Sequence, residues 1–147
     1  MQEVNFDEAV ELILAIDVRF HRDAYSFLRE ALDFTQKLIG KENLGKVRHV
    51  TGQELLDGIR RFALQQFGPM SVTVFEEWGI HNCQDFGEIV FNMVENGLLA
   101  KTEKDTRADF QNGYDFTEAF RKPFWPQEKV NADAKPLALK IGDVPKK

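Results

Sequence analysis

His81 and Cys83 stand two residues apart, with Asp85 and Glu88 nearby, and imidazole and thiolate groups at such spacing can hold a metal ion. A zinc site takes about four ligands, usually supplied as spaced pairs, so a single His-x-Cys is a weak signal. The alternative is that Cys83 packs as a small apolar residue while His81 forms hydrogen bonds in a turn. We therefore predict no metal and no cofactor, with His81 and Cys83 as weak candidates for metal ligands.

No other group of residues has a spacing typical of catalysis. His21 and His49 belong to no recognisable constellation, and the ten glycines are scattered rather than gathered in a phosphate-binding loop. Glu76 and Glu77 are adjacent, so on a helix their carboxylates point to different faces. We predict no catalytic residues, although an enzyme without a linear motif remains an alternative.

The stretch VFEEWGIHNCQDF, residues 74–86, has the pattern of a helix-turn-helix. We expect a helix at residues 72–78, a turn at Gly79-Ile80 and a second helix from about residue 84 to residue 95. A further helix precedes them: TGQE at residues 51–54 is a capping box that starts it, and Gly68-Pro69 ends it.

Two strands are expected after the helix-turn-helix. LLAK at residues 98–101 reads as one, and the Asn-Gly of QNGY suits a tight hairpin turn that leads into a returning strand at residues 114–116. Helix, helix-turn-helix and β-hairpin follow one another in the order of a winged helix, which we place at residues 51–120.

Winged helices often bind DNA, but the charges here argue against it. Residues 62–100 contain no lysine or arginine. Asp85, Glu88, Asn92 and Glu95 share one face of the expected second helix, with no cation expected nearby. Because binding to nucleic acid depends on neutralising phosphates, an acidic recognition face argues against that function. The same four residues are instead candidates for a protein-interaction surface.

The N-terminal residues 1–40 predict a helical hairpin. Asn5 caps its first helix, a break follows at residues 20–23, and Gly40 ends the second helix. The apolar residues of the first helix span an arc of roughly 200°, wider than a surface helix needs. They are Phe6, Ala9, Val10, Leu12, Ile13, Leu14 and Ile16. This helix is therefore central in its own fold, or it covers a second copy in a homodimer.

Residues 121–147 read as an extended or partly disordered tail, because RKPFWPQ is interrupted by prolines. Phe124 and Trp125 are large apolar side chains outside any expected helix. They either attach the chain's end to its own helices or insert into a groove on a partner.

Composition favours one soluble domain in the cytoplasm. The chain has 147 residues and a formal net charge of −5, and its single cysteine cannot form an intrachain disulfide. The acidic N-terminus does not resemble a signal peptide, and no apolar run is long enough to span a membrane.

The motifs HVTGQELLDGIR, FGPMSVTVFEEWGI and DFGEIVFNMVENG, followed by NGYDF and RKPFWP, resemble a family of small bacterial proteins whose function is uncharacterised. The resemblance runs from the first helix to about Pro126. It implies a shared fold and a bacterial, cytosolic setting, and it brings no activity, cofactor or catalytic residue. Our prediction is a mainly α protein, a helical hairpin packed on a winged-helix-like unit, that acts as a non-catalytic protein-interaction module.

Overall fold

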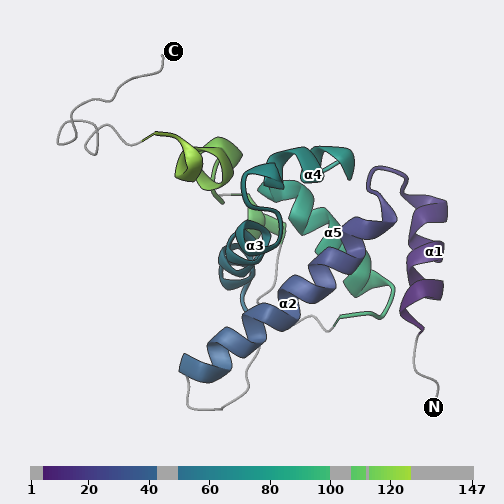
Figure 1. The fold of residues 1–147 in the computed structure, drawn as a ribbon. Coiled ribbons are helices and arrows are strands. Elements are labelled where there is room, and N and C mark those ends of the chain that lie inside the picture. The colour runs from purple at the N-terminus through teal and green to yellow at the C-terminus, as the bar shows by residue number, and fades with distance from the viewer. Residues whose placement is uncertain (1–4, 43–49, 100–106, 112, 127–147) are drawn as a thin grey trace, which may run out of the picture.

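The structure is a computed structural model that describes residues 5–42, 50–99, 107–111 and 113–126. The fold is mainly α, as predicted (Figure 1). Its helices are α1 (Phe6–Ile16), α2 (Arg22–Glu42), α3 (Gly52–Phe67), α4 (Ser71–Glu77) and α5 (Cys83–Glu95). Short helical turns connect or follow them: η1 (Gly68–Met70), η2 (Arg107–Phe110), η3 (Thr117–Arg121) and η4 (Lys122–Phe124).

Local signals in the sequence set the helix ends. Asn5 caps α1 by accepting a hydrogen bond from the Glu8 backbone N–H, and Thr51 and Glu54 form the predicted capping box of α3. Gly68 ends α3 with a positive φ of 53°. These starts and stops confirm the predicted positions, because each is decided by side chains within one helical turn of the end.

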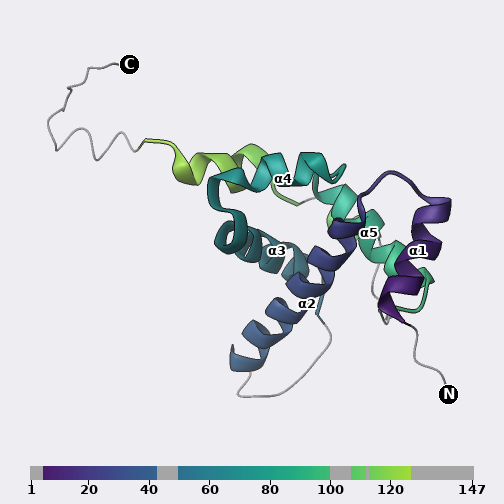
Figure 2. The same cartoon turned by 45° about the vertical axis from the view of Figure 1, so that its right-hand side comes forward.

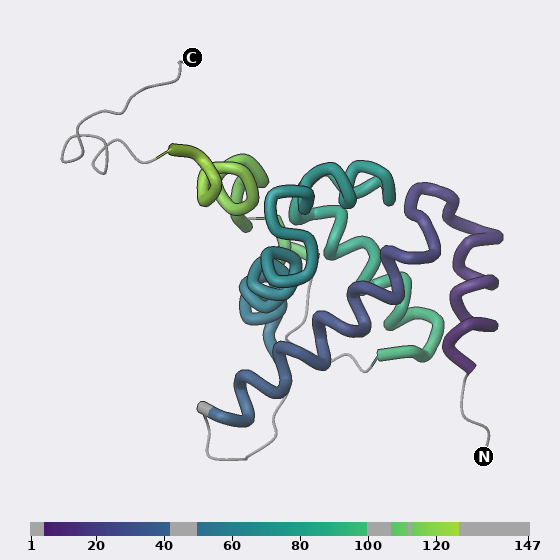
Figure 3. Tube along the Cα trace, in the orientation of Figure 1, coloured from purple at the N-terminus to yellow at the C-terminus, as the bar shows by residue number. Residues whose placement is uncertain are grey.

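The long helix α2 packs against helices that come before it and after it in the chain. Helices α3 and α5 pack on α2, while α1 contacts α2 and α5. The tube in Figure 3 shows α1 beside the start of α2, at the side of the molecule opposite η3 and η4, and the turned view in Figure 2 keeps that separation. One side of α1 therefore faces the core, and none of the helices in the described residues lies over the other side.

The core is dominated by aromatic rings. Phe75 of α4 is fully buried and lies at its centre, with the Phe86 and Phe120 ring centroids each 5.3 Å from its own. Rings from α2, α3, the end of α4 and the segment after η2 also surround it: Phe27, Phe67, Trp78 and Phe116. Such tilted and edge-on contacts are the favoured geometry for aromatic pairs. Aromatic rings from segments before the helix-turn-helix in the sequence and from segments after it thus pack against Phe75.

Two helix boundaries differ from the prediction. Helix α2 does not end at Gly40 but continues to Glu42, and Gly40 has no positive φ. A helix-interior glycine costs only about 1 kcal/mol, and Ile39 just before it is buried, so packing outweighs the local stop signal. Residues 121–124 are not extended either, because Arg121 ends η3 and Lys122–Phe124 forms η4.

The predicted strand at residues 114–116 is wrong. Phe116 is helical, and η3 follows at Thr117. The Asp115 carboxylate accepts hydrogen bonds from the Thr117 and Glu118 backbone N–H groups, which starts a helical turn there. This turn places Phe116 and Phe120 together, and their rings lie 5.3 Å apart in the core. Phe120 is fully buried and Phe116 partly buried, and the gain from this burial favours the helical turn over a strand.

Other expectations fall partly or wholly outside the described residues. These are His49, the turn residue Asn112, most of the expected strand at residues 98–101 and the tail beyond residue 126. Leu98 and Leu99, which are described, form bends, and the described ranges contain no strand. Within those same ranges no helix combines the length and apolar character needed to cross a lipid bilayer.

Candidate functional site

Two arginines from other segments of the chain contact the acidic face of α5. Glu88 lies between them, with its Oε1 3.3 Å from Nη2 of Arg19 and its Oε2 3.1 Å from Nε of Arg107. Glu95 lies 3.7 Å from the other end of the Arg107 guanidinium. The expectation that no cation lies near this face is therefore wrong. Arg19 comes from the loop after α1 and Arg107 from η2, so both reach α5 only through the tertiary fold.

Asn92, on the same face, joins α5 to the first part of the chain. Its side-chain amide donates hydrogen bonds to Oδ2 of Asp17 and to the hydroxyl oxygen of Tyr25, at 3.0 and 3.1 Å. Asp17 also accepts three hydrogen bonds from the Arg19 guanidinium, two from Nε and one from Nη2. Those bonds from Arg19, with the one from Asn92, hold the pKa of Asp17 far below its usual range, although desolvation by burial acts in the opposite direction.

Asp85, the fourth predicted residue of this face, acts at the start of the helix. Its carboxylate accepts a hydrogen bond from the His81 backbone N–H, while its own N–H donates to the Asn82 side chain. Together, Asp85, Glu88 and Asn92 hold α5 to the turn before it and to the loop after α1. The structure places these residues at an internal joint, and Glu95 at its edge.

The turn of the helix-turn-helix packs against that same loop. The His21 backbone N–H donates to the Trp78 carbonyl oxygen at 3.0 Å. Gly79 has a φ of 88°, and a Cβ added there would lie 2.2 Å from the Arg19 carbonyl oxygen. Glycine is thus required for two reasons, the left-handed backbone and the close approach of another segment. The turn is a docking point within the fold.

His81 and Cys83 point to different environments. Cys83 is buried, and its Sγ lies 3.4 Å from the Tyr114 carbonyl oxygen; burial raises the pKa of its thiol to about 11. The His81 side chain is exposed at the surface, with Nδ1 3.7 Å from the nearest Asp85 carboxylate oxygen. In the part of the chain that the structure describes, no three His, Cys, Asp or Glu residues come together as a metal site would need.

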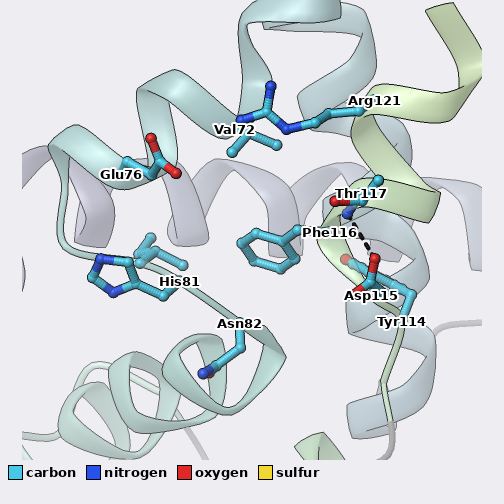
Figure 4. Close-up of a pocket in the computed structure, with 10 residues that line it drawn as sticks. Val72, Glu76, His81, Asn82, Tyr114, Asp115, Phe116, Thr117 and Arg121 are labelled. Atoms are coloured by element: carbon cyan, nitrogen blue, oxygen red, sulfur yellow. Dashed lines mark hydrogen bonds between the residues drawn. The ribbon is translucent and has the colours of Figure 1, made fainter. Parts of the chain in front are cut away.

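A pocket of about 400 Å³ opens between the helix-turn-helix and η3 (Figure 4). Phe116 lies at its middle, with His81 and Glu76 on one side and Arg121 above. Glu76, His81 and Arg121 are all exposed, so water competes strongly for their charges. The pocket offers both carboxylate and guanidinium groups to a small polar molecule. The sequence does not predict this pocket, because its residues come from two segments that are far apart in the chain, positions 72–82 and 114–121.

Phe124 and Trp125 lie at the end of the described chain and are half-exposed, 47% and 49%. The Lys122 ammonium lies 5.9 Å from the centre of the Trp125 ring, a cation–π contact within η4 and its cap. Neither side chain is part of the buried core. About half of each ring therefore remains available for contact with something else.

The outer face of α1 and the loop just after it present the most highly exposed of the large apolar side chains among the described residues. Leu12, Ile16 and Val18 are 63%, 84% and 83% exposed, whereas Ala9 and Ile13 on the inner side are buried. The wide apolar arc in the sequence is thus divided between the core and solvent. Three large aliphatic groups so close together on a surface mark a contact site more often than isolated ones do.

Comparisons of the chain with protein-family models, with curated proteins and with solved structures find no match.

Proposed function

We propose that this protein is a non-catalytic protein-interaction module whose docking surface is the outer face of α1. The observation that carries the proposal is the exposure of Leu12 and Ile16 on α1 and of Val18 in the loop after it, on a segment that is otherwise anchored. Exposing apolar side chains to water is unfavourable in free energy, so a partner that covers them gains binding free energy. Phe124 and Trp125 are half-exposed and give a second exposed apolar surface, and the helical turns η3 and η4 lie on the side of the molecule opposite α1 (Figure 1).

The anchoring of α1 supports this role. Because Arg19 binds Glu88 and the His21 backbone N–H binds Trp78, the end of α1 is tied to both helices of the helix-turn-helix. A surface held in one orientation loses less conformational freedom when a partner binds. On this proposal, the acidic residues of α5 position the docking surface rather than contact the partner.

The scaffold in this proposal is α3, α4 and α5, in the order of the helices of a winged helix. The proposal includes the bacterial, cytosolic setting that the sequence resemblance implies. Binding to nucleic acid is the alternative, and the described charges do not favour it: Arg19 and Arg107 are bound to carboxylates of α5, while Arg60 and Arg61 both pair with Asp57. In the pocket of Figure 4, Glu76, His81 and Arg121 are exposed to solvent, which weakens the case for an enzyme there.

The test is cross-linking in the native lysate with three forms of the full chain. The wild type is compared with a double variant, Leu12→Asp with Ile16→Asp, and with Met70→Asp as a control. Met70 is 55% exposed and belongs to η1, so the control changes an exposed apolar residue elsewhere. Half of each sample is treated with nuclease beforehand.

We expect a protein partner whose cross-links map to α1, present with the wild type and with Met70→Asp and lost with the double variant. Nuclease treatment should leave it unchanged. Cross-linked complexes that disappear after nuclease treatment, or as the salt concentration is raised, would instead support nucleic-acid binding. Cross-links that avoid α1, or that survive the double variant, would contradict the proposal.

A further inference from the structure

We propose that the pocket between the helix-turn-helix and η3 binds a free α-amino acid with an apolar side chain. The ligand's carboxylate binds Arg121, its ammonium group binds Glu76, and its side chain lies against Phe116, three residues that line the pocket. This site is separate from the outer face of α1. The inference therefore stands or falls independently of the proposed function.

Glu76 and Arg121 bring opposite charges to the pocket without pairing with each other. Among the described residues, neither side chain forms an ion pair or a hydrogen bond. Figure 4 shows the Glu76 carboxylate and the Arg121 guanidinium on the same side of the Phe116 ring. They belong to different elements, α4 and η3. Two opposite charges held apart in this way match a ligand that carries one charge of each sign.

Arg121 differs in this respect from the other arginines that the structure describes. Each of those pairs with a carboxylate or lies over a phenylalanine ring: Arg19, Arg22, Arg29, Arg60, Arg61 and Arg107. The fold has thus matched the charge of the other described arginines with a partner. The Arg121 guanidinium faces the pocket with its donors unused by the described chain.

Two other polar side chains of the pocket are already used within the fold. The Asp115 carboxylate accepts hydrogen bonds from two backbone N–H groups of η3, and the Asn82 side chain caps α5. These bonds fix the backbone on both sides of the pocket. Glu76 and Arg121 remain as a carboxylate and a guanidinium that can bind a ligand without breaking a bond of the described fold.

The element that carries Arg121 has an unusual backbone. η3 is a π-helical turn, in which the Lys122 backbone N–H bonds to the Thr117 carbonyl oxygen five positions earlier. Such turns are rare, and where they occur they are frequently at functional sites. Thr117 and Arg121, the first and last residues of the turn, both line the pocket. The backbone is thus a second, independent indication of a binding site.

The size and walls of the pocket fit a small molecule with an apolar part. Its volume of about 400 Å³ lies within the range of about 300–1,000 Å³ that small-molecule sites occupy. Val72 and Ile80 are buried apolar residues of its wall, and the Phe116 ring is partly buried. An aliphatic or aromatic side chain of the ligand gains binding free energy by covering these groups.

A simple anion or a simple amine matches only half of the pocket. Phosphate or a carboxylate is attracted to Arg121 and repelled by Glu76, and an amine experiences the reverse. A free α-amino acid carries its ammonium group and its carboxylate on one carbon, so both charges of the pocket find a partner at once. In a peptide those two groups lie at opposite ends of the chain. The pair of charges therefore selects the free amino acid.

Amide NMR of the full chain tests the proposal, with L-phenylalanine as the probe. Because both charges are exposed, we expect weak, saturable binding with a dissociation constant of about 1 mM. The largest shifts should occur in η3 and in the turn at residues 79–82. N-acetyl-phenylalanine lacks the ammonium charge and phenylalaninamide lacks the carboxylate. Each should bind the wild type at least about threefold more weakly than phenylalanine does.

Two substitutions assign the charges. Arg121→Gln should bind phenylalaninamide at least as tightly as phenylalanine, because the carboxylate has lost its partner. Glu76→Gln should bind N-acetyl-phenylalanine at least as tightly as phenylalanine, for the corresponding reason. The matched controls are Lys122→Gln and Glu77→Gln, which remove a charge of the same sign at the next position, outside the lining of the pocket. Both controls should keep the wild-type order of affinities.

The comparison of the three compounds uses the wild type alone, so it decides the question even if a variant is unstable. No saturation by phenylalanine up to about 20 mM would overturn the proposal. Shifts centred on another part of the chain, or equal binding of all three compounds, would overturn it as well. So would an order of affinities that survives both Arg121→Gln and Glu76→Gln. None of these outcomes affects the docking of a protein on α1, which the cross-linking experiment tests separately.

Discussion

Nη2 of Arg19 lies 3.3 Å from Oε1 of Glu88, a contact that joins the loop after α1 to the middle of α5 across 69 positions of sequence. Arg19 also binds Asp17, whose carboxylate accepts a hydrogen bond from Asn92 one turn further along α5. The loop is therefore fastened to α5 at two successive turns. The orientation of α1, and with it the exposed face of Leu12 and Ile16, depends on this joint.

The first prediction concerns Glu88, which forms ion pairs with both Arg19 and Arg107. Glu88→Gln keeps the size of the side chain and removes its charge. We expect a loss of about 1 kcal/mol in the free energy of unfolding, since partly exposed ion pairs contribute up to about that much each. Urea denaturation measures it. The loss should shrink in 1 M salt, because salt screens such pairs.

Glu77→Gln is the matched control. Glu77 is exposed and takes part in no ion pair within the ranges that the structure describes, so its loss should change stability by less than about 0.5 kcal/mol. Equal effects of the two substitutions at low salt would show that the arginines near Glu88 contribute nothing to folding.

The second prediction concerns Asp17, whose pKa is held far below its usual range, first by Arg19. A carboxylate with a lowered pKa in the folded state stabilises the fold at every pH above its unfolded pKa, about 3.9, and that contribution is lost as the pH falls below it toward the folded pKa. The wild type should therefore lose stability between about pH 4 and pH 2. Asp17→Asn should remove the part of that loss that belongs to this group.

Urea denaturation at pH 7 and pH 2.5 checks this. At pH 7 we expect Asp17→Asn to be less stable by about 1.5–3 kcal/mol, the usual range for a hydrogen bond to a charged group. At pH 2.5 the difference should narrow. Asp23→Asn is the control, since Asp23 is exposed and, among the residues that the structure describes, its carboxylate lies near the exposed His21 ring and forms no ion pair with a lysine or arginine. A difference for Asp17→Asn that is constant with pH would contradict a lowered pKa.

The helix ends could be predicted from sequence because they depend on neighbours in the chain. Asn5, Thr51 and Gly68 each act within one turn of the helix that they start or end. Gly40 carries the same stop signal and is overridden, because the adjacent Ile39 is buried. A local rule therefore holds where packing does not oppose it.

The charge environment of α5 could not be predicted in that way. Its acidic residues follow from the sequence, but Arg19 lies 69 positions from Glu88 and only the tertiary fold brings them together. The turn at residues 114–116 shows a different limit. Asp115 followed by Glu118 is a helix-start signal, yet the neighbouring Asn-Gly predicts a hairpin turn. The pocket at Arg121 joins two distant segments and has no sequence pattern at all.

The third prediction compares two glycines with positive φ. Gly68 has a φ of 53° and open space where a Cβ would lie, whereas Gly79 has a φ of 88° and the Arg19 carbonyl oxygen 2.2 Å from that position. Gly68→Ala should lose only the backbone strain, about 1–2 kcal/mol. Gly79→Ala should lose at least about 2 kcal/mol more, because the neighbour is backbone and cannot rotate away. Thermal unfolding of the two variants measures the difference, and equal losses would show that the turn does not dock on the loop after α1.

The fourth prediction concerns the thiol of Cys83. Burial raises its pKa to about 11 and places Sγ beside the Tyr114 carbonyl oxygen, so at neutral pH the thiolate fraction is roughly 300-fold below that of a free cysteine with a pKa near 8.5. A thiol-specific reagent should label the native protein at least about 100-fold more slowly than the protein in urea, since thiolate fraction and access both fall. Raising the pH from 7 to 9 should speed native labelling without a plateau.

Adding zinc should not raise the unfolding temperature of the wild type above that of Cys83→Ser. A zinc-dependent rise in unfolding temperature that Cys83→Ser abolishes would show that Cys83 and His81 move together to bind metal.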